Sequence, residues 1–313
     1  IFRIPRITVL LLFIIFFSGY NLKAQTKLMQ QPALSDTHVS FIYAEDLWIA
    51  NKDGSNPIRL TIDEGIESNP IFSPDGSMIA FNAQYDGNSD VFIVPVNGGI
   101  PKRLTWHPYN DLVRDFSADG KTILFASQRN SFTNSYMQLF TISIHGGTTT
   151  QLDIPNAFWA SYSDDNSHIA YTPIPDRFNQ WKHYRGGTAT RIWLYNTKSH
   201  KVEEIQKPAG GSNDSQPKWM GDDVYFKSDR DGEFNLYSYN TNTKAIDKLT
   251  DYKDFPVINI AANNGFVIYE QAGTLHIYNT KTGANKHFNI NITTDLLELR
   301  ERFISGKNYV RSG

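Results

Sequence analysis

The chain of 313 residues contains no cysteine, and this absence removes several kinds of site at once. Disulfide bonds, thiol nucleophiles and cysteine-based zinc or iron–sulfur centres are all excluded. A chain that is exported without disulfides has to be stabilised by the packing of its core. With 40% hydrophobic and 13% aromatic residues, this sequence has the material for such a core.

Recognisable catalytic and metal-binding motifs are absent as well. None of the eight histidines belongs to a His-Glu-x-x-His motif, and no Gly-x-Ser-x-Gly elbow occurs. The paired acids Glu203-Glu204 and Asp222-Asp223 are adjacent, so on a strand their side chains point apart. The segment Asp86-Gly87-Asn88-Ser89-Asp90 resembles the start of a calcium loop but lacks its later Gly and Glu, which favours a hairpin turn. We therefore expect no catalytic residue, metal site or cofactor in this chain.

Long apolar runs and basic patches are scarce. The one apolar run, residues 7–17, follows two arginines, and the segment after it ends at the small residue Ala24, which is the pattern of a secretory signal peptide. A membrane span needs about 20 apolar residues, so the run is too short for one. We expect cleavage before Gln25 and a periplasmic or secreted protein. Removal of residues 1–24 takes three basic residues and no acidic one, which moves the formal net charge from −2 to −5 and does not favour nucleic-acid binding.

What the sequence does contain is a repeated phrase. Its clearest copy begins at Pro70-Ile71-Phe72-Ser73-Pro74-Asp75-Gly76 and ends at Arg103-Leu104-Thr105. The turn recurs at Ser117-Ala118-Asp119-Gly120 and Ser163-Asp164-Asp165-Asn166, and the ending recurs at Arg59-Leu60-Thr61 and Lys248-Leu249-Thr250. Repeats of 40 to 50 residues with four short alternating strands each are typical of β-propellers.

The predicted fold is all-β, a six-bladed β-propeller of four-stranded antiparallel sheets. The six units are residues 31–61, 69–105, 111–152, 157–205, 215–250 and 255–290. Glycine-containing turns such as Asp53-Gly54 and Asn97-Gly98-Gly99 are placed between the third and fourth strands. We expect a signal peptide at 1–24, the propeller at 25–290 and a connection to a following domain at 291–313. The only helix candidate is 295–300, and Lys27-Leu28 is predicted to add a strand that helps close the ring.

The fourth unit is the longest because of an insertion at residues 174–190. In a propeller, the turn between the second and third strands emerges on the same face as the links between blades. We therefore expect the insertion to share a rim with residues 106–109 and 251–253. The candidate peptide-binding or docking residues on this rim are Trp181, Lys182, Tyr184, Arg185, His107 and Tyr109. Aromatic rings beside Arg and Lys could hold an extended peptide, the cation pairing with a carboxylate. The alternative is that these residues only dock the loop on its neighbours or on another domain.

One segment of the insertion is more specific than the repeats. Trp181-Lys182-His183-Tyr184-Arg185-Gly186-Gly187 resembles the Trp-Lys-x-Tyr-Arg-Gly-Gly segment of tricorn-type proteases, which lies in the fourth unit of their N-terminal propeller. The phrases Glu45-Asp46-Leu47-Trp48 and Ser228-Asp229-Arg230-Asp231-Gly232 agree with this resemblance, which covers residues 31–313. The generic repeat phrases are shared with TolB and with prolyl-oligopeptidase propellers.

The resemblance implies a large exported serine peptidase with a tail-specific-protease-like catalytic domain beyond Gly313. The nucleophilic Ser and the His of that family match no residue here, so the implied role of this chain is to control the passage of peptides. The expected partners are peptides or unfolded polypeptide and the missing domains of the same protein, and the sequence leaves a homo-oligomer open. Two other hypotheses stand beside this one: a TolB-like periplasmic propeller in an envelope complex, and a surface propeller that binds glycans or peptides.

Overall fold

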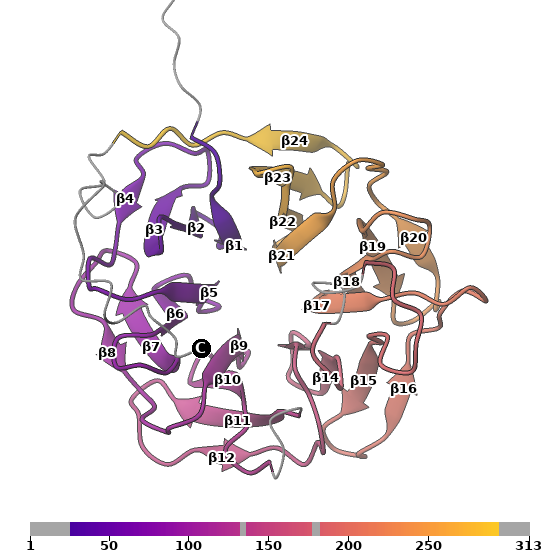
Figure 1. Cartoon of the computed structure of the whole chain (residues 1–313), viewed down its shortest axis with the longest axis horizontal. Coiled ribbons are helices and arrows are strands. Elements are labelled where there is room, and N and C mark those ends of the chain that lie inside the picture. Colours follow the sequence, from indigo (N-terminus) through magenta and orange to yellow (C-terminus); the bar gives the residue numbers. More distant parts are fainter. Residues whose placement is uncertain (1–25, 132–135, 177–181, 294–313) are drawn as a thin grey trace, which may run out of the picture.

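The computed structural model describes residues 26–131, 136–176 and 182–293. Within these ranges the chain forms six four-stranded antiparallel sheets, which are arranged around a central axis (Figure 1). In every sheet the strands follow one another in chain order, from the axis to the outer edge. The predicted six-bladed all-β propeller is therefore confirmed. The helix candidate at 295–300 lies outside the described residues.

The strand bounds agree with the predicted units to within a few residues. Blade 1 contains β1 (Gln30–Leu34), β2 (His38–Tyr43), β3 (Asp46–Asn51) and β4 (Ile58–Arg59); blade 2 contains β5 (Glu67–Phe72), β6 (Met78–Ala83), β7 (Asp90–Pro95) and β8 (Lys102–Arg103). Blade 3 contains β9 (Asp111–Phe116), β10 (Thr122–Ser127), β11 (Gln138–Ser143) and β12 (Thr150–Gln151); blade 4 contains β13 (Ala160–Tyr162), β14 (His168–Tyr171), β15 (Trp193–Asn196) and β16 (Val202–Glu204). Blade 5 contains β17 (Asp214–Met220), β18 (Asp223–Ser228), β19 (Asn235–Asn240) and β20 (Ile246–Lys248); blade 6 contains β21 (Val257–Asn263), β22 (Phe266–Gln271), β23 (Thr274–Asn279) and β24 (Asn285–Phe288).

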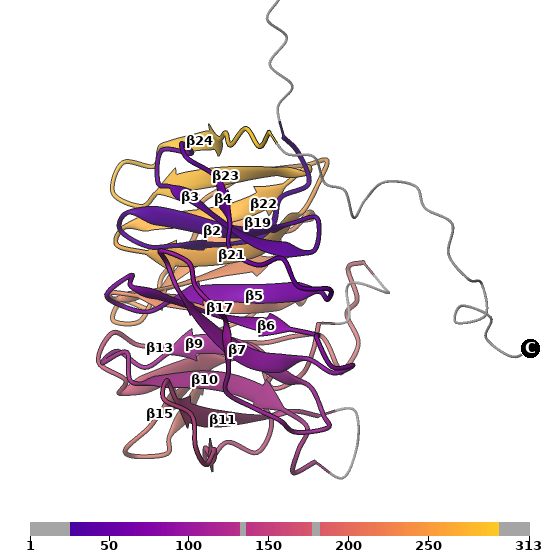
Figure 2. The same ribbon diagram turned by 90° about the vertical axis from the view of Figure 1, so that its left-hand side faces the viewer.

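Seen from the side, the ring has two ends (Figure 2). We call one end the turn face, because the turns between first and second strands and between third and fourth strands emerge there. The other end is the connection face, which carries the turns between second and third strands and the links from blade to blade. This division follows from the antiparallel order of the four strands.

The Ser-Pro-Asp-Gly phrase builds turns of the turn face. The hydroxyl of Ser73 donates a hydrogen bond to Asp75 at 2.6 Å and accepts one from the backbone N–H of Met78 at 3.0 Å. Gly76 has a φ of +69°, which glycine adopts without the steric cost that a side chain brings. Hydrogen bonds from Ser73 and Ser77 hold the pKa of Asp75 below its usual range. The same serine-to-aspartate bond recurs at Ser117–Asp119 and Ser163–Asp165.

The Arg-Leu-Thr phrase ties the fourth strand to the third strand in blades 1 and 2. In blade 2, Arg103 forms an ion pair with Asp90 at 2.6 Å, and the hydroxyl of Thr105 accepts the backbone N–H of Val91 at 3.0 Å. Leu104, between them, is buried in the core between blades 2 and 3. Blade 1 repeats the scheme with Arg59, Asp46 and Thr61. The phrase thus holds the outermost strand of the blade to the third strand.

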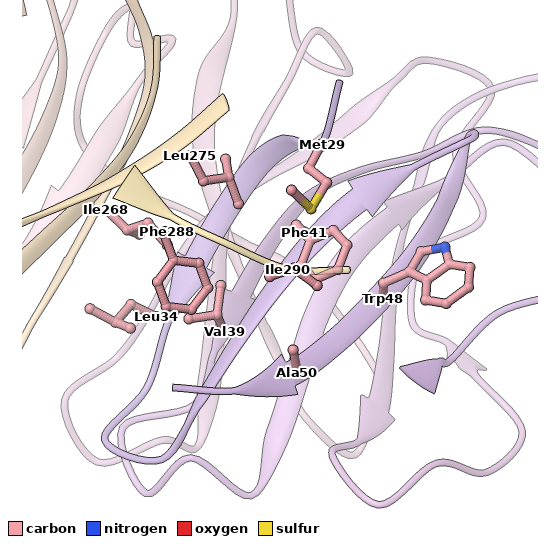
Figure 3. Close-up of a cluster of buried hydrophobic side chains, with 10 residues drawn as sticks. All are labelled: Met29, Leu34, Val39, Phe41, Trp48, Ala50, Ile268, Leu275, Phe288 and Ile290. Carbon is pink, nitrogen blue, oxygen red and sulfur yellow. The ribbon is translucent and has the colours of Figure 1, made fainter. Parts of the chain in front are cut away.

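The ring closes between blades 1 and 6 through packed side chains (Figure 3). Leu34, Val39 and Phe41 of blade 1 share one buried cluster with Leu275 and Phe288 of blade 6. Each of the two blades has its own four strands, so no strand is shared between them. The prediction that Lys27-Leu28 adds a strand is therefore wrong: β1 begins at Gln30, and blade 6 is complete without it.

The segments outside the first and last strands nevertheless cross the closure. Residues 26–29 reach blade 6, where the N–H of Leu28 donates to the carbonyl of Gly273 at 2.9 Å. Residues 289–292 run in the opposite direction along blade 1 (Figure 1). There, the carbonyl of Asn289 lies against Gly54, and the N–H of Ile292 donates to the hydroxyl of Thr26 at 2.8 Å. We call these two segments the clasp.

Candidate functional site

The axial channel is lined by one equivalent residue from each first strand. In every blade this residue is paired with the third residue of the second strand. The six positions, which we call the channel ring, are Ala33, Ile71, Asp115, Ser161, Lys218 and Ala261. All six line a cavity of about 270 Å³ that is bordered by the turns of the turn face. The turn face therefore has an open mouth on the axis.

Beyond the channel ring the channel narrows. A second cavity of about 40 Å³ continues toward the connection face, and Ile71, Lys218 and Ala261 line both cavities. A water molecule occupies about 30 Å³ in the liquid, so this part is far too small for a polypeptide. The channel is therefore blind from the turn face in this conformation.

Polar side chains at bulges of the first strands narrow the channel. The strand pairing is irregular next to Gln31, Asn69 and Gln216, and all three have positive φ angles of 48–52°. The N–H of Asn69 donates to the side-chain carbonyl of Gln31 at 2.5 Å, and the amide of Gln216 donates to Asn259 at 3.0 Å. Glu270 joins the two halves by accepting from the backbone of Gln31 and from Asn259. These five residues, which we call the amide belt, link blades 2, 1, 6 and 5.

Arg114 and Trp159 continue the narrowing on the side of blades 3 and 4. The guanidinium of Arg114 lies 4.2 Å from the ring centre of Trp159, and its Nε donates to the carbonyl of Phe158. The side chain of Arg114 is buried, and this burial lowers its pKa to about 9. The negative charge of Asp176, at the start of the insertion, acts against this lowering of the Arg114 pKa. The carboxylate of Asp176 also accepts a hydrogen bond from the indole N–H of Trp159 at 3.2 Å.

The insertion lies against blade 5. Lys182 forms an ion pair with Glu233 at 2.5 Å, and Arg185 forms one with Asp229 at 2.7 Å. The backbone carbonyl of Tyr184 accepts from the amide of Asn213 at 2.9 Å. The predicted Lys182, Tyr184 and Arg185 are thus brought together on the connection face. Trp181 lies outside the described residues.

Asp229 is the centre of this contact. Its carboxylate is fully buried and also accepts from His183 at 3.3 Å and from the backbone and side chain of Asn213 at 2.7 and 3.0 Å. The charges of Arg185 and Lys182 are therefore already compensated within the ring, although both side chains keep exposed surface.

His107 and Tyr109 lie elsewhere on the connection face. Their rings stack at 5.6 Å in the link between blades 2 and 3, where Asn88 donates to the carbonyl of His107 at 2.7 Å. Within the described residues, none of their contacts reaches the insertion, because blade 3 separates the link from it. His107 and Tyr109 therefore lie on the same face as the described part of the insertion, as predicted, but in a separate cluster.

The calcium-like segment is a turn between β6 and β7. Arg103 pairs with both Asp86 and Asp90, at 2.5 and 2.6 Å. In the described ranges, no group of three or more His, Asp or Glu side chains could hold a metal ion. No helix in these ranges is long and apolar enough to cross a membrane.

Sequence reasoning missed Lys218, Arg114, Asp229 and Glu233. Lys218 and Arg114 lie in first strands of their blades. The alternation of apolar and polar residues in these strands does not show whether a polar side chain faces the channel or the solvent. Asp229 was part of a turn phrase, and its partner Arg185 is 44 residues away. A buried carboxylate after a strand, opposite an unmatched basic insertion, is the only signal that could have found this contact.

Comparison with known proteins agrees with this geometry. The family model of the tricorn protease N-terminal β-propeller domain matches residues 26–284. Tricorn protease homolog 1 of Streptomyces coelicolor is 29% identical over 252 residues, which are 79% of this chain and 23% of that protein. A putative tricorn-like protease N-terminal subunit of Sulfurisphaera tokodaii is 27% identical over 56% of this chain and 86% of its own length.

Solved structures give the same fold. The crystal structure of the tricorn protease superposes with a TM-score of 0.77 at 21% identity, over 86% of this chain and 27% of that one. A putative TolB from Agrobacterium tumefaciens superposes with a TM-score of 0.61 at 18% identity, over 86% and 91%. The chain spans about a quarter of the length of full-length curated tricorn relatives. On the match of the family model to most of its length, the chain belongs to the tricorn protease N-terminal β-propeller family.

Proposed function

We propose that this chain is the non-catalytic propeller of an exported tricorn-like serine peptidase, and that it guides peptides to a catalytic domain elsewhere in the same protein. The observation that carries the proposal is the narrow axial channel in a member of a protease family. The mouth of about 270 Å³ excludes folded proteins and can take only chain ends or short peptides, and passage beyond it requires the narrow part of the channel to widen. No nucleophile with an adjacent base is recognisable in the sequence, so cleavage is assigned to other domains.

The connection face is the surface on which we place the rest of the protein. Large apolar side chains are exposed there in the links and turns of several blades: Leu28, Ile62, Ile66, Trp106, Tyr109, Tyr136 and Phe255. Of the eleven large apolar side chains that are exposed among the described residues, these seven lie on the connection face, which favours this face as the interaction surface. A relative named as an N-terminal subunit supports a partner of this kind, because a separate subunit has to bind its other half without a covalent link.

Peptide handling can be tested in the full-length protein through Arg185. We expect Arg185→Ala to change the cleavage of long peptides and to leave small chromogenic substrates nearly unaffected, because a rim residue cannot touch a distant scissile bond. Arg185 also pairs with Asp229, so each variant is first checked for folding. Arg191→Ala, which removes an exposed partner of Glu204 at 3.7 Å in the same blade, is the control. If a stably folded Arg185→Ala variant cleaves both long and short substrates as the natural protein does, the insertion has no role in peptide handling.

The isolated chain tests the non-catalytic half of the proposal. Purified residues 25–313 should cleave no peptide. Turnover by this fragment that a single Ser substitution abolishes would overturn the assignment. Export is tested by N-terminal sequencing, which should find a mature protein that begins near Gln25. A soluble cytoplasmic protein with residues 1–20 intact would contradict export.

A TolB-like binding propeller in an envelope complex is the second candidate. It is favoured by one observation, the coverage of 91% of the Agrobacterium TolB chain. The gene sequence downstream of Gly313 separates the two. A second propeller and a catalytic domain support the peptidase, whereas a stop codon soon after Gly313 supports the free-standing propeller.

A further inference from the structure

The channel ring has two chemically different halves. Blades 3, 4 and 5 contribute the polar residues Asp115, Ser161 and Lys218, and the remaining three positions are Ala33, Ile71 and Ala261. Small residues at several of the six positions leave the cavity of about 270 Å³ open on the axis. A ligand in this mouth would meet charge on one side and apolar surface on the other.

The negative charge of the polar half, the carboxylate of Asp115, already has hydrogen-bond donors within the protein. One carboxylate oxygen of Asp115 accepts from the hydroxyl of Ser161 at 2.9 Å and from the N–H of Tyr162 at 2.8 Å. The other oxygen accepts from the N–H of Phe116 at 2.9 Å. Ser161 is engaged in turn, because its hydroxyl accepts from the N–H of Trp219 at 3.0 Å. These bonds fix Asp115 and Ser161 in the wall of the channel.

The side chain of Lys218, in contrast to those of Asp115 and Ser161, has no hydrogen-bond partner within the described residues. Among the described residues, its ammonium group has no hydrogen-bond acceptor and no carboxylate within 4.0 Å. Burial lowers the pKa of Lys218, Asp115 opposes this shift, and the nearby charge of Arg114 adds to it. The side chain of Lys218 keeps part of its surface exposed in the cavity, so an anion that enters the mouth could reach the ammonium group and form a charge-assisted hydrogen bond with it.

The position of Lys218 suggests which anion fits. Lys218 lines both the open mouth and the narrow part behind it, so it stands at the blind end of the pocket. Ligand pockets usually hold about 300–1,000 Å³, so this pocket is small and accepts the end of a chain more readily than its middle. The other charged residue at the mouth, Asp164, is exposed at the rim, and one of its oxygens accepts from the N–H of Gly221 at 3.0 Å.

We propose that the turn-face mouth binds the C-terminal carboxylate of a peptide, with Lys218 as its ionic partner. The last side chain of the peptide then lies against Ala33, Ile71 and Ala261, which favours a small apolar residue. This site goes beyond the proposed function, because it operates in the propeller alone and needs no catalytic domain.

Isothermal titration of the chain with the tripeptide Ala-Ala-Ala tests the site directly. The free acid should bind, and the C-terminally amidated tripeptide should bind at least about tenfold more weakly, since an ionic contact worth 1.4 kcal/mol changes affinity tenfold. Acetate alone should bind more weakly than the tripeptide acid, which separates recognition of a chain end from recognition of any carboxylate. Equal binding of acid and amide, equal binding of acetate and tripeptide, or no binding of the acid at millimolar concentrations would overturn the proposal.

Substitutions identify the residues. Lys218→Met should weaken binding of the acid at least about tenfold, which corresponds to the loss of one ionic contact. Lys121→Met, which removes an exposed cation from the same face, should leave it unchanged. If Lys218→Met does not fold, Ala261→Leu keeps the cation and fills the apolar side, and it should block the tripeptide but not acetate. Binding that survives both Lys218→Met and Ala261→Leu excludes this mouth as the site. A negative result leaves the role in the peptidase standing, because that role is measured separately in the full-length protein.

Discussion

The two faces of the ring are held together in different ways. On the turn face, a residue such as Ser73 finds its partners Asp75 and Met78 two and five positions away. On the connection face, Arg185 reaches 44 residues to Asp229 and Lys182 reaches 51 residues to Glu233. The Ser-Asp turns of the turn face are therefore stabilised by local, repeated bonds, and the insertion on the connection face by long-range contacts that occur once. Substitutions on the two faces should therefore change the free energy of unfolding by different amounts, and these changes should depend differently on pH.

The largest effect is expected at Asp229. Asp229→Ala leaves the backbone and side-chain N–H groups of Asn213 without their buried acceptor, and each buried polar group left unsatisfied costs about 1–3 kcal/mol. Arg185 also loses its partner, but its guanidinium is 34% exposed and can turn to water. Chemical denaturation should report this loss in the free energy of unfolding. Asp251→Ala, which removes an exposed carboxylate from the same face, should have a much smaller effect. Similar effects of the two substitutions would mean that the insertion is not anchored through Asp229.

Glu67 should make the connection face sensitive to pH. Burial raises the pKa of Glu67 to about 7. The hydroxyl of Thr61 donates a hydrogen bond to the Glu67 carboxylate at 3.0 Å, which makes this rise smaller. The folded chain therefore holds this proton more tightly than the unfolded chain, and stability falls as pH rises from about 4.5 to 7. Glu67→Gln should remove this loss, which is up to about 3 kcal/mol for a shift of this size. Denaturation at pH 5 and pH 8 measures it.

The matched control for Glu67 is Glu64→Gln, because Glu64 is exposed in the same link. The difference in stability between pH 5 and pH 8 should stay the same in this variant as in the natural chain. A Glu67→Gln variant with an unchanged pH dependence would show that the folded state does not retain the proton on Glu67.

Two glycines on the turn face allow the cost of backbone strain to be distinguished from the cost of displacing the clasp. Gly54 and Gly98 occupy the turn between third and fourth strands of blades 1 and 2, and both have a φ of +85°. A Cβ at Gly54 would lie 2.2 Å from the carbonyl oxygen of Asn289, whereas a Cβ at Gly98 meets nothing within 4 Å. Gly98→Ala should cost about 1–2 kcal/mol for the backbone conformation. Gly54→Ala should cost about 1–3 kcal/mol more, because residues 289–292 have to move. Equal costs would mean that the clasp is not held at Gly54.

The smallest effect is expected for a single turn of the repeat. Ser73→Ala loses one bond to Asp75 and one from Met78, and a local side-chain cap of this kind is worth about 1 kcal/mol. Thermal unfolding should detect the change, with the exposed Ser199→Ala as the control. A loss as large as that of Asp229→Ala would contradict the local character of the turn face.

The predictability of the structure follows the same division. The blades and their turns could be predicted because Ser73, Asp75 and Leu104 act within one repeat, where spacing and residue type are visible in the sequence. The contact of Arg185 with Asp229 depends on how blade 4 leans toward blade 5, which no local pattern reports. Lys218 was invisible for another reason. Its importance arises from the five residues at equivalent positions in other blades, so only the closed ring reveals it.

The closure of the ring also has a consequence for synthesis. Leu34 and Val39 are buried against Leu275 and Phe288, roughly 240 residues later in the chain. Ribosomes add about 5–20 residues per second, so the apolar flank of blade 1 waits on the order of 10–50 s for its partner. During this time, a nascent chain can fold each blade as it appears but cannot finish the circle. The flank of blade 1 is therefore the place where a chaperone, or a blade from a second nascent chain, has time to bind.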